Sequence, residues 1–184
     1  MSKIIIGLTG QIASGKDVNK KYLEEKYGAK SFRFSTIMRE IVTRLGLEIN
    51  RHNLVNISLC LRKTFGEDLF AKTMANDVMN DAAEIIVVDG IRRLADIEYL
   101  KKVPGFHLIS VDASPEIRYD RLIKRNENKG DSEKTYEQFL ADEKLETEAS
   151  IPSVMTQAEV TINNNGNFEE LYQQIEVIMQ NLNK

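Results

Sequence analysis

The chain has 184 residues, of which 42% are hydrophobic and 29% charged, and its formal net charge is -3. These proportions exclude a disordered or fibrous protein and suit a single domain spanning 1–184. The slight negative charge excludes the overall positive field that favours non-specific nucleic-acid binding. No stretch approaches the ~18–20 apolar residues that cross a bilayer. We therefore expect a cytoplasmic protein with no membrane or nucleic-acid partner, and we expect its single cysteine, Cys60, to be a buried apolar side chain.

Short apolar segments alternate with helical patterns along the chain. The predicted strands are Lys3–Thr9, Ser31–Phe34, Glu84–Asp89, Phe106–Val111 and Glu159–Asn163. Helical spacing is found over about Gly15–Tyr27, Ile37–Leu45, Leu54–Phe65, Leu69–Met79, Arg93–Lys102, Pro115–Arg125, Tyr136–Thr147 and Phe168–Leu182. This alternation predicts an α/β fold with three α/β/α layers, in which helices cover both faces of a five-stranded parallel sheet. Ligands of such sheets bind beyond the carboxyl ends of the strands.

The segment between the first strand and the first helix carries the most specific motif of the chain. Residues 10–17 match G-x-x-x-x-G-K-[ST] everywhere except at the last position. Glycines in this motif let backbone amides and a helix N-terminus surround a phosphate, while the lysine reaches the β- and γ-phosphates of a nucleotide. The predicted nucleotide-binding residues are accordingly Gly10, Ala13, Ser14, Gly15, Lys16 and Asp17.

Asp17 replaces the hydroxyl residue that normally ligates Mg²⁺ in this motif. A carboxylate there can still bind the metal, directly or through water, but it adds negative charge beside the β-phosphate. Two outcomes stay open: altered metal geometry with activity retained, or nucleotide binding with weak turnover. We favour the first, because the rest of the constellation is intact.

Three further motifs complete a resemblance to P-loop nucleoside-monophosphate-type kinases that covers nearly the whole chain. They are Asp89–Arg93, Arg121–Arg125 and Asn163–Gly166. The local sequences look closest to dephospho-coenzyme A kinases and archaeal adenylate-kinase-related proteins, and phage-type deoxynucleoside-monophosphate kinases share a loop like Gly15–Lys16–Asp17. The resemblance implies ATP as phosphoryl donor, Mg²⁺ as cofactor, a helical lid over about 118–147 and acceptor-binding helices over about 35–80.

The resemblance also implies roles for individual residues. Asp89 would help to hold Mg²⁺ together with Asp17, while Arg92 and Arg93 would bind the acceptor phosphate. Arg121 would lie over the base of ATP and Arg125 on its phosphates, and the turn with Asn164 and Gly166 would touch adenine. The residues implied to be catalytic are Lys16, Asp89, Arg92 and Arg125. The alternatives are a helix cap for Asp89, surface positions for Arg92 and Arg93, ion pairs within their own helix for the lid arginines, and a plain turn for the asparagines.

The residues after the second strand bear on the acceptor. Dephospho-coenzyme A kinases place an aspartate there, whereas this chain has Phe34–Ser35–Thr36 and no carboxylate before Glu40. A hydroxyl acceptor generally profits from a base, and an acceptor phosphate is already ionised. Arg39 lies where monophosphate kinases use an arginine on that phosphate, and we assign Arg33 and Ser35 to the same pocket.

The leading hypothesis is therefore an ATP-dependent phosphotransferase acting on a nucleoside or deoxynucleoside monophosphate. A dephospho-coenzyme A kinase-like enzyme is the alternative within the class. A nucleotide-binding regulatory module, in which Asp17 weakens turnover, is the alternative from another class. The base and sugar of the acceptor, the choice between ATP and GTP, and the oligomeric state, for which a homodimer is one option, stay open.

Overall fold

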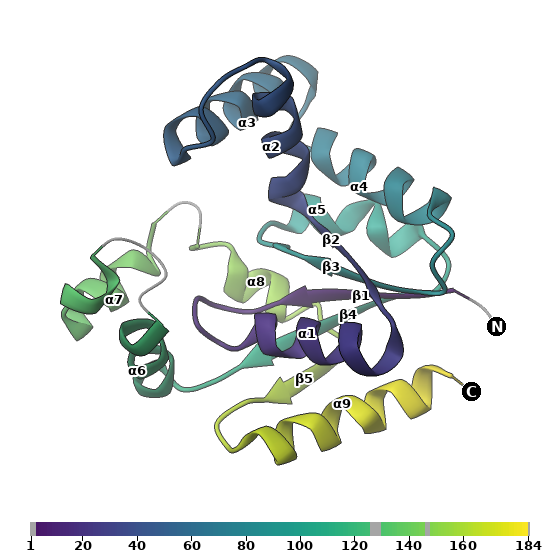
Figure 1. Cartoon of the computed structure of the whole chain (residues 1–184), viewed down its shortest axis with the longest axis vertical. Helices are drawn as coiled ribbons and strands as arrows, with labels where there is room; N and C mark the ends of the chain where they lie inside the picture. Colours follow the sequence, from purple (N-terminus) through teal and green to yellow (C-terminus); the bar gives the residue numbers. More distant parts are fainter. Residues whose placement is uncertain (1–2, 126–129, 146–147, 184) are drawn as a thin grey trace.

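The computed structural model describes residues 3–125, 130–145 and 148–183 as a sheet flanked by helices (Figure 1). The strands are β1 (Ile4–Thr9), β2 (Lys30–Arg33), β3 (Ile85–Asp89), β4 (Phe106–Asp112) and β5 (Val160–Asn163). The α-helices are α1 (Lys16–Tyr27), α2 (Phe34–Arg44), α3 (Arg51–Phe65), α4 (Leu69–Asn80), α5 (Leu94–Glu98), α6 (Pro115–Arg125), α7 (Tyr136–Asp142), α8 (Ile151–Met155) and α9 (Phe168–Leu182). Two short 3-10 helices are η1 (Leu100–Lys102) and η2 (Asp131–Glu133).

The five strands form one parallel sheet in the order β2-β3-β1-β4-β5. β1 lies in the centre, where Ile6 is in register with Val87 of β3 and His107 of β4. All six residues of β1 are buried, which explains a strand sequence that is apolar almost throughout. The chain passes from β1 to the β2 and β3 side and then crosses to β4. The carboxyl end of β1 is therefore a topological switch point, the place where open α/β sheets bind ligands.

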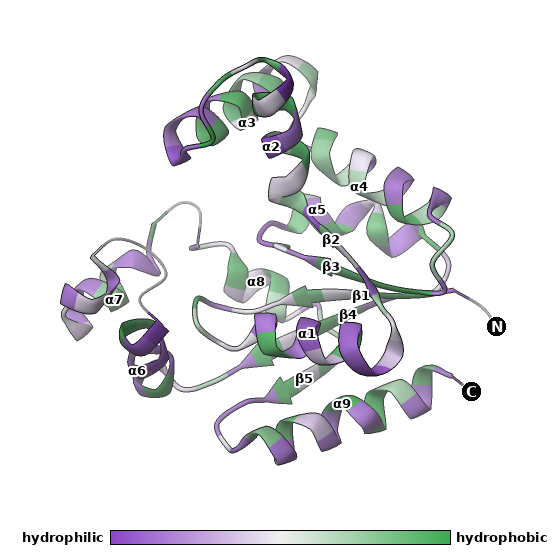
Figure 2. Cartoon of the chain, viewed as in Figure 1, coloured by the Kyte–Doolittle hydropathy of each residue, from purple (hydrophilic) through white to green (hydrophobic). Residues whose placement is uncertain are grey.

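Successive residues of the strands face opposite sides of the sheet, so each face has its own core. One core joins Ile4, Ile6 and Leu8 of β1 to residues of α1 and α9. The other joins Ile5 of β1 to side chains of α2, α4, α5 and α8, among them Phe34, Phe70, Met74, Ile97 and Val154. In Figure 2 the central strands are largely green, whereas most helices alternate between green and purple. The predicted three-layer α/β/α architecture is confirmed.

The helix boundaries differ from the sequence prediction in the second half of the chain. Residues 151–155, for which the sequence predicts no helix, form α8, and Pro152 fits there because proline is tolerated in the first turn of a helix. The helix predicted over Arg93–Lys102 is divided into α5 and η1, and α7 ends at Asp142 rather than near Thr147. Of the predicted lid 118–147, residues 126–129 and 146–147 lie outside the described residues.

The prediction that Cys60 is buried is wrong. Cys60 is exposed, because α3 packs against α2 and α4 along one side only and Cys60 lies on its outer side. Leu59 beside it is 55% exposed, whereas Leu61 packs against the core. Within the described residues, none of the helices is both long and apolar enough to cross a bilayer.

β3 lies inside the sheet, between β2 and β1, so we expect its buried side chains to stabilise the fold. Ile86 is fully buried in the core beneath α2 and α4, so Ile86→Ala would remove packed methyl groups and leave a cavity. We expect a loss of about 2–5 kcal/mol in the free energy of unfolding, measured by urea denaturation. Val177→Ala on the exposed side of α9, where Val177 is 56% exposed, is the control and should change this free energy by less than about 0.5 kcal/mol. Equal effects of the two substitutions would contradict the described core.

Candidate functional site

The loop predicted to hold phosphates joins the end of β1 to the start of α1. Gly10 lies so close to β4 that a Cβ would collide with the carbonyl oxygen of Val111, and Gly15 has a φ of 100°. Ala13 has a φ of 59°, and among the described residues it is the one non-glycine position with a positive φ. Strained backbone of this kind clusters at ligand sites, where the surrounding structure holds it in place. The loop thus has the tightly constrained backbone that an anion cradle requires.

Two buried polar atoms beside this loop have no hydrogen-bond partner in the described part of the chain. They are the hydroxyl oxygen of Ser14 and Nη1 of Arg121. Buried polar groups without partners are costly, so a native structure that keeps them usually has a further partner for them. A hydroxyl and a guanidinium both pair with the oxygens of a polyphosphate. The residues present therefore fit a bound nucleotide.

Lys16, the first residue of α1, turns its ammonium group back onto the loop. Its Nζ donates hydrogen bonds to the carbonyl oxygens of Gly10 at 2.6 Å and Gln11 at 2.9 Å. Burial lowers the pKa of Lys16 to about 8, while the charge of Asp89 opposes this shift and that of Arg92 adds to it. The half-buried ammonium group therefore has only carbonyl oxygens as hydrogen-bond acceptors within the part of the chain that the structure describes. An anion in the loop would be a better partner than these carbonyls.

The two aspartates predicted to hold Mg²⁺ are joined by Arg33 at the end of β2. Nη2 of Arg33 lies 3.1 Å from Oδ1 of Asp17 and 2.7 Å from Oδ2 of Asp89, and its Nε donates to the same Asp89 oxygen at 2.9 Å. Arg125 of α6 approaches Asp17 from another direction, at 3.7 Å. The structure therefore brings together Asp17, Asp89, Arg33 and Arg125, which come from four different elements. Carboxylate oxygens are the ligands that Mg²⁺ prefers, so this donor set fits that ion.

The predicted base-binding residues meet on the other side of the loop. Nδ2 of Asn164 donates to the carbonyl oxygen of Ser14 at 2.7 Å, and its Oδ1 lies 3.5 Å from Nη2 of Arg121. Asn164 packs so closely on Gly15 that a Cβ at Gly15 would collide with it. Burial lowers the pKa of the Arg121 guanidinium below its usual value. Gly15, Arg121 and Asn164 thus form one contiguous surface between α1, α6 and the end of β5.

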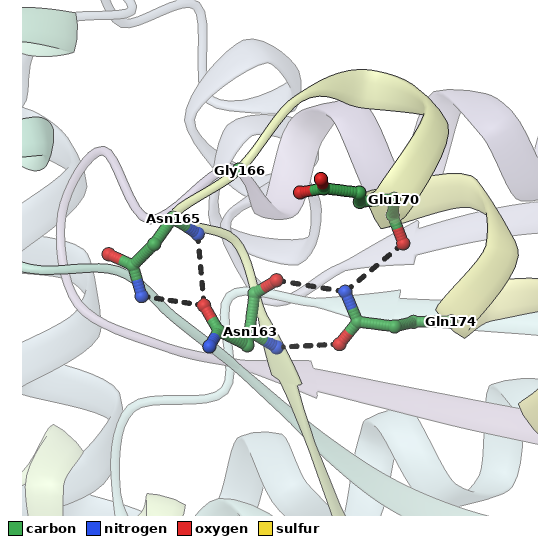
Figure 3. A pocket seen from close by; sticks show the side chains of 5 residues that line it. All are labelled: Asn163, Asn165, Gly166, Glu170 and Gln174. Carbon is green, nitrogen blue, oxygen red and sulfur yellow. Dashed lines mark hydrogen bonds between the residues drawn. The ribbon is translucent and has the colours of Figure 1, made fainter.

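Gly166 lies in the same turn as Asn164 but lines a cavity away from the phosphate loop. This cavity, of about 500 Å³, is bordered by Asn163, Asn165, Gly166, Glu170 and Gln174 (Figure 3). The side chain of Gln174 binds both backbone groups of Asn163, and the Asn163 side chain accepts a bond from the Asn165 backbone N–H at 3.0 Å. These bonds fix the turn after β5 against α9. Gly166 is therefore brought to the edge of the site, whereas no contact joins it to the phosphate loop in the described structure.

A buried arginine that the sequence analysis did not single out connects α6 to the phosphate loop through Glu143. Arg118 of α6 is 2% exposed, donates to the carbonyl oxygen of Ala113 at 2.9 Å and forms an ion pair with Glu143, just after α7. Glu143 also accepts a hydrogen bond from the side chain of Gln11 in the loop, at 3.1 Å. The available signal was that Arg118 precedes the buried Leu122 by one helical turn and so lies on the inner stripe of α6. Its partner, 25 residues away, left no local pattern.

The arginines assigned to the acceptor have different surroundings. Arg92 forms an ion pair with Glu148, and Arg93 pairs with Glu67 between α3 and α4 at 3.1 Å. Arg39 on α2 is exposed, and it has no ion pair or side-chain hydrogen bond within residues 3–125, 130–145 and 148–183. Ser35 is half-buried in the first turn of the same helix. The sequence analysis missed both glutamates, because each lies in a connection far along the chain from its arginine.

The comparisons with known proteins agree with this geometry. A family model described as AAA domain matches residues 6–148, which include the phosphate loop, Asp89 and the arginines of α6. A UPF0200 protein of Methanococcus maripaludis is 29% identical over 98% of this chain and 98% of its own. A UPF0200 protein of Methanocaldococcus jannaschii is 28% identical over 97% of this chain and 90% of its own.

The solved structures bear on the fold. Shikimate kinase from Bacteroides thetaiotaomicron superposes with a TM-score of 0.63 over 98% of this chain and 99% of its own, at 15% sequence identity. At that identity the likeness shows the fold alone, which is that of a P-loop kinase. The resemblance to P-loop nucleoside-monophosphate-type kinases is thus confirmed at the level of the fold. With a family model covering most of its sequence and a matching architecture, this chain belongs to the AAA domain family of P-loop proteins.

Proposed function

We propose that this chain is an ATP-dependent phosphotransferase whose acceptor is a nucleoside or deoxynucleoside monophosphate. The observation that carries the proposal is the convergence of Lys16, Asp17, Asp89, Arg33 and Arg125 at the switch point of the sheet. Phosphoryl transfer depends mainly on positioning and on neutralising the charge of the transferred group. A half-buried lysine with two arginines and two carboxylates is suited to that task.

On the donor side, the loop Gly10–Gly15 would hold the polyphosphate and Lys16 would exchange its carbonyl partners for β- and γ-phosphate oxygens. Arg121 and Asn164 would border the base, and Arg125 would neutralise phosphate charge from the lid. Asp17 and Asp89 would hold Mg²⁺, directly or through water. Bound there, the ion would supply Lewis-acid neutralisation of the phosphate oxygens.

On the acceptor side, the monophosphate proposal rests on Arg39 and on the missing carboxylate after β2. Arg39 has no carboxylate partner in the described structure and so is available for an anion. Arg92 and Arg93 would take the acceptor phosphate after leaving Glu148 and Glu67. A guanidinium binds phosphate and carboxylate with the same fork of donors, so this exchange of partners is chemically natural.

In this proposal, residues of about 118–147 form a lid and helices over about 35–80 bind the acceptor. The substrate is a small molecule, and the protein acts in the cytoplasm. The contact of Glu143 with both Arg118 and Gln11 supports a lid that responds to the phosphate loop. Closing such a lid excludes water and protects the donor from hydrolysis.

One observation favours a second candidate, a kinase for a hydroxyl acceptor such as dephospho-coenzyme A. The side chain of Glu148 is only 17% exposed, pairs with Arg92 and raises the pKa of Lys16 through its charge. It therefore lies near the group that would bind the γ-phosphate. A carboxylate in that place is the kind of base that a hydroxyl acceptor needs and that β2 does not supply.

The first test is an acceptor panel in an ADP-release assay with ATP and Mg²⁺. We expect release stimulated by at least one nucleoside or deoxynucleoside monophosphate, and a kcat lowered by about 10²–10³-fold in Lys16→Ala, because the charge stabilising the transferred phosphate is lost. Tight ATP binding without transfer to any acceptor would instead support a regulatory module. No ATP or GTP binding at all would end the proposal.

Two substitutions separate the acceptor classes. With a monophosphate acceptor, Arg39→Met should raise its KM by about 10–100-fold through the loss of a charged hydrogen bond, while Glu148→Gln should lower KM because it frees Arg92. With a hydroxyl acceptor, Glu148→Gln should instead lower kcat by about 10²–10⁴-fold. Arg44→Met, at the exposed end of α2, is the matched control and should leave both constants unchanged.

The pKa of Lys16 predicts how ATP affinity depends on pH. Phosphate bound beside the ammonium group would raise this pKa from its value of about 8 in the nucleotide-free chain, so binding above that pH takes up a proton. The association constant should be nearly level at lower pH and fall above pH 8 by up to about tenfold per pH unit. Calorimetry between about pH 7.5 and 9.5 in buffers of different ionisation enthalpy would measure both effects. If the ATP affinity of the wild type depended on pH no more than that of Lys16→Met, the prediction would be contradicted.

A further inference from the structure

Arg33 occupies the same carboxylate oxygens that the proposed function gives to Mg²⁺. We infer that Arg33 is an internal counter-ion which holds Asp17 and Asp89 in the nucleotide-free chain and makes metal binding at this site depend on nucleotide. The inference rests on the proposed function in one respect, the use of these two aspartates for the metal. It goes further by assigning a role to Arg33 and a reason for the unusual residue at position 17.

The geometry leaves little room for a metal ion while Arg33 is in place. Two nitrogens of Arg33, Nε and Nη2, contact Oδ2 of Asp89 at 2.9 and 2.7 Å. The other oxygen of Asp89 accepts the backbone N–H of Gly90 at 2.7 Å. Asp17 presents Oδ1 to the same Nη2 at 3.1 Å. Both oxygens of Asp89 therefore have donors, and the shared guanidinium stands between the two carboxylates.

Charge explains why a cation must stand there. The side chain of Asp89 is only 7% exposed, and a buried carboxylate without a partner is strongly destabilising. The side chain of Asp17 is 59% exposed, and its other cations, Lys20 and Arg125, lie farther away at 3.6 and 3.7 Å. Arg33 is thus the cation in direct contact with both acids. In the nucleotide-free chain a divalent ion would have to displace this guanidinium from both carboxylates.

A nucleotide removes this obstacle because it brings anions with the metal. Guanidinium groups pair with phosphate as well as with carboxylate. Arg33 could then move from the aspartates to phosphate oxygens as the ion takes its place, so that each charge keeps a partner. A hydroxyl at position 17, as in the usual motif, could not hold the guanidinium by charge. The carboxylate of Asp17 is therefore explained as the second anchor of Arg33.

The test is metal binding by the nucleotide-free chain, with Mn²⁺ as the probe and electron paramagnetic resonance as the readout. Arg33→Met should bind Mn²⁺ roughly tenfold to a hundredfold more tightly than the wild type, since a unit positive charge has left the two carboxylates. Arg44→Met removes the same charge from the exposed end of α2 and should bind like the wild type. Adding Asp89→Asn to Arg33→Met should abolish the gain. If Arg33→Met is unfolded by circular dichroism, Arg33→Gln, which keeps a polar end group, takes its place.

Two results would overturn the inference. One is Mn²⁺ affinity in the Arg33 variant no higher than in Arg44→Met. The other is a gain in affinity that survives Asp89→Asn, which would place the ion elsewhere. ATP binding by the wild type is measured separately by calorimetry, and its failure would count against the proposed function. The Mn²⁺ comparison uses no nucleotide, so the two failures are distinguishable.

Discussion

Charge compensation at the carboxyl ends of β1, β2 and β3 is the constraint on which the candidate site depends. Asp89 is buried and Lys16 is half-buried, and both charges need partners there. Arg33 supplies the partner for Asp89, and the loop carbonyls supply poor partners for Lys16. The nucleotide-free site therefore pairs its carboxylates but leaves its lysine with carbonyl partners alone among the described residues, and an arriving polyphosphate would supply a better partner.

The same principle connects the site to the segments around it. Glu143 pairs with Arg118 and binds Gln11, and Glu148 pairs with Arg92, so the two ends of the connection after α7 are held by the phosphate loop and by the turn after β3. Phosphates placed in the loop or on Arg92 would compete with these carboxylates. Under the proposed function, ligand binding and the position of this connection would be linked through shared cations, with no need for a long-range pathway.

Much of the fold could be predicted from the sequence because its signals are local. The buried strand Ile4–Thr9, the glycine-rich loop and the amphipathic α9 each carry their own pattern, and all five strands lie where the apolar runs place them. The α8 helix was not predicted because its five residues are too few to show helical spacing, and Cys60 was misplaced because the sequence does not tell which side of α3 is covered. The acidic partners Glu67, Glu143 and Glu148 could not be predicted, since each pairing depends on how distant segments pack.

The three arginines assigned to the acceptor differ in whether a carboxylate already pairs with them. Arg92 and Arg93 are held by Glu148 and Glu67, whereas Arg39 has neither an ion pair nor a side-chain hydrogen bond in the described part of the chain. A substrate anion could therefore bind Arg39 without breaking an ion pair of the described residues. To bind Arg92 or Arg93 it would have to displace Glu148 or Glu67. Since Glu67 lies between the helices α3 and α4 and Glu148 lies beside the lid, displacing both would release contacts on each side of the site. Under the proposed function, an acceptor phosphate that reaches Arg92 and Arg93 would release Glu148 and Glu67 as it binds, so that capture of the acceptor and movement of the segments on both sides would be coupled.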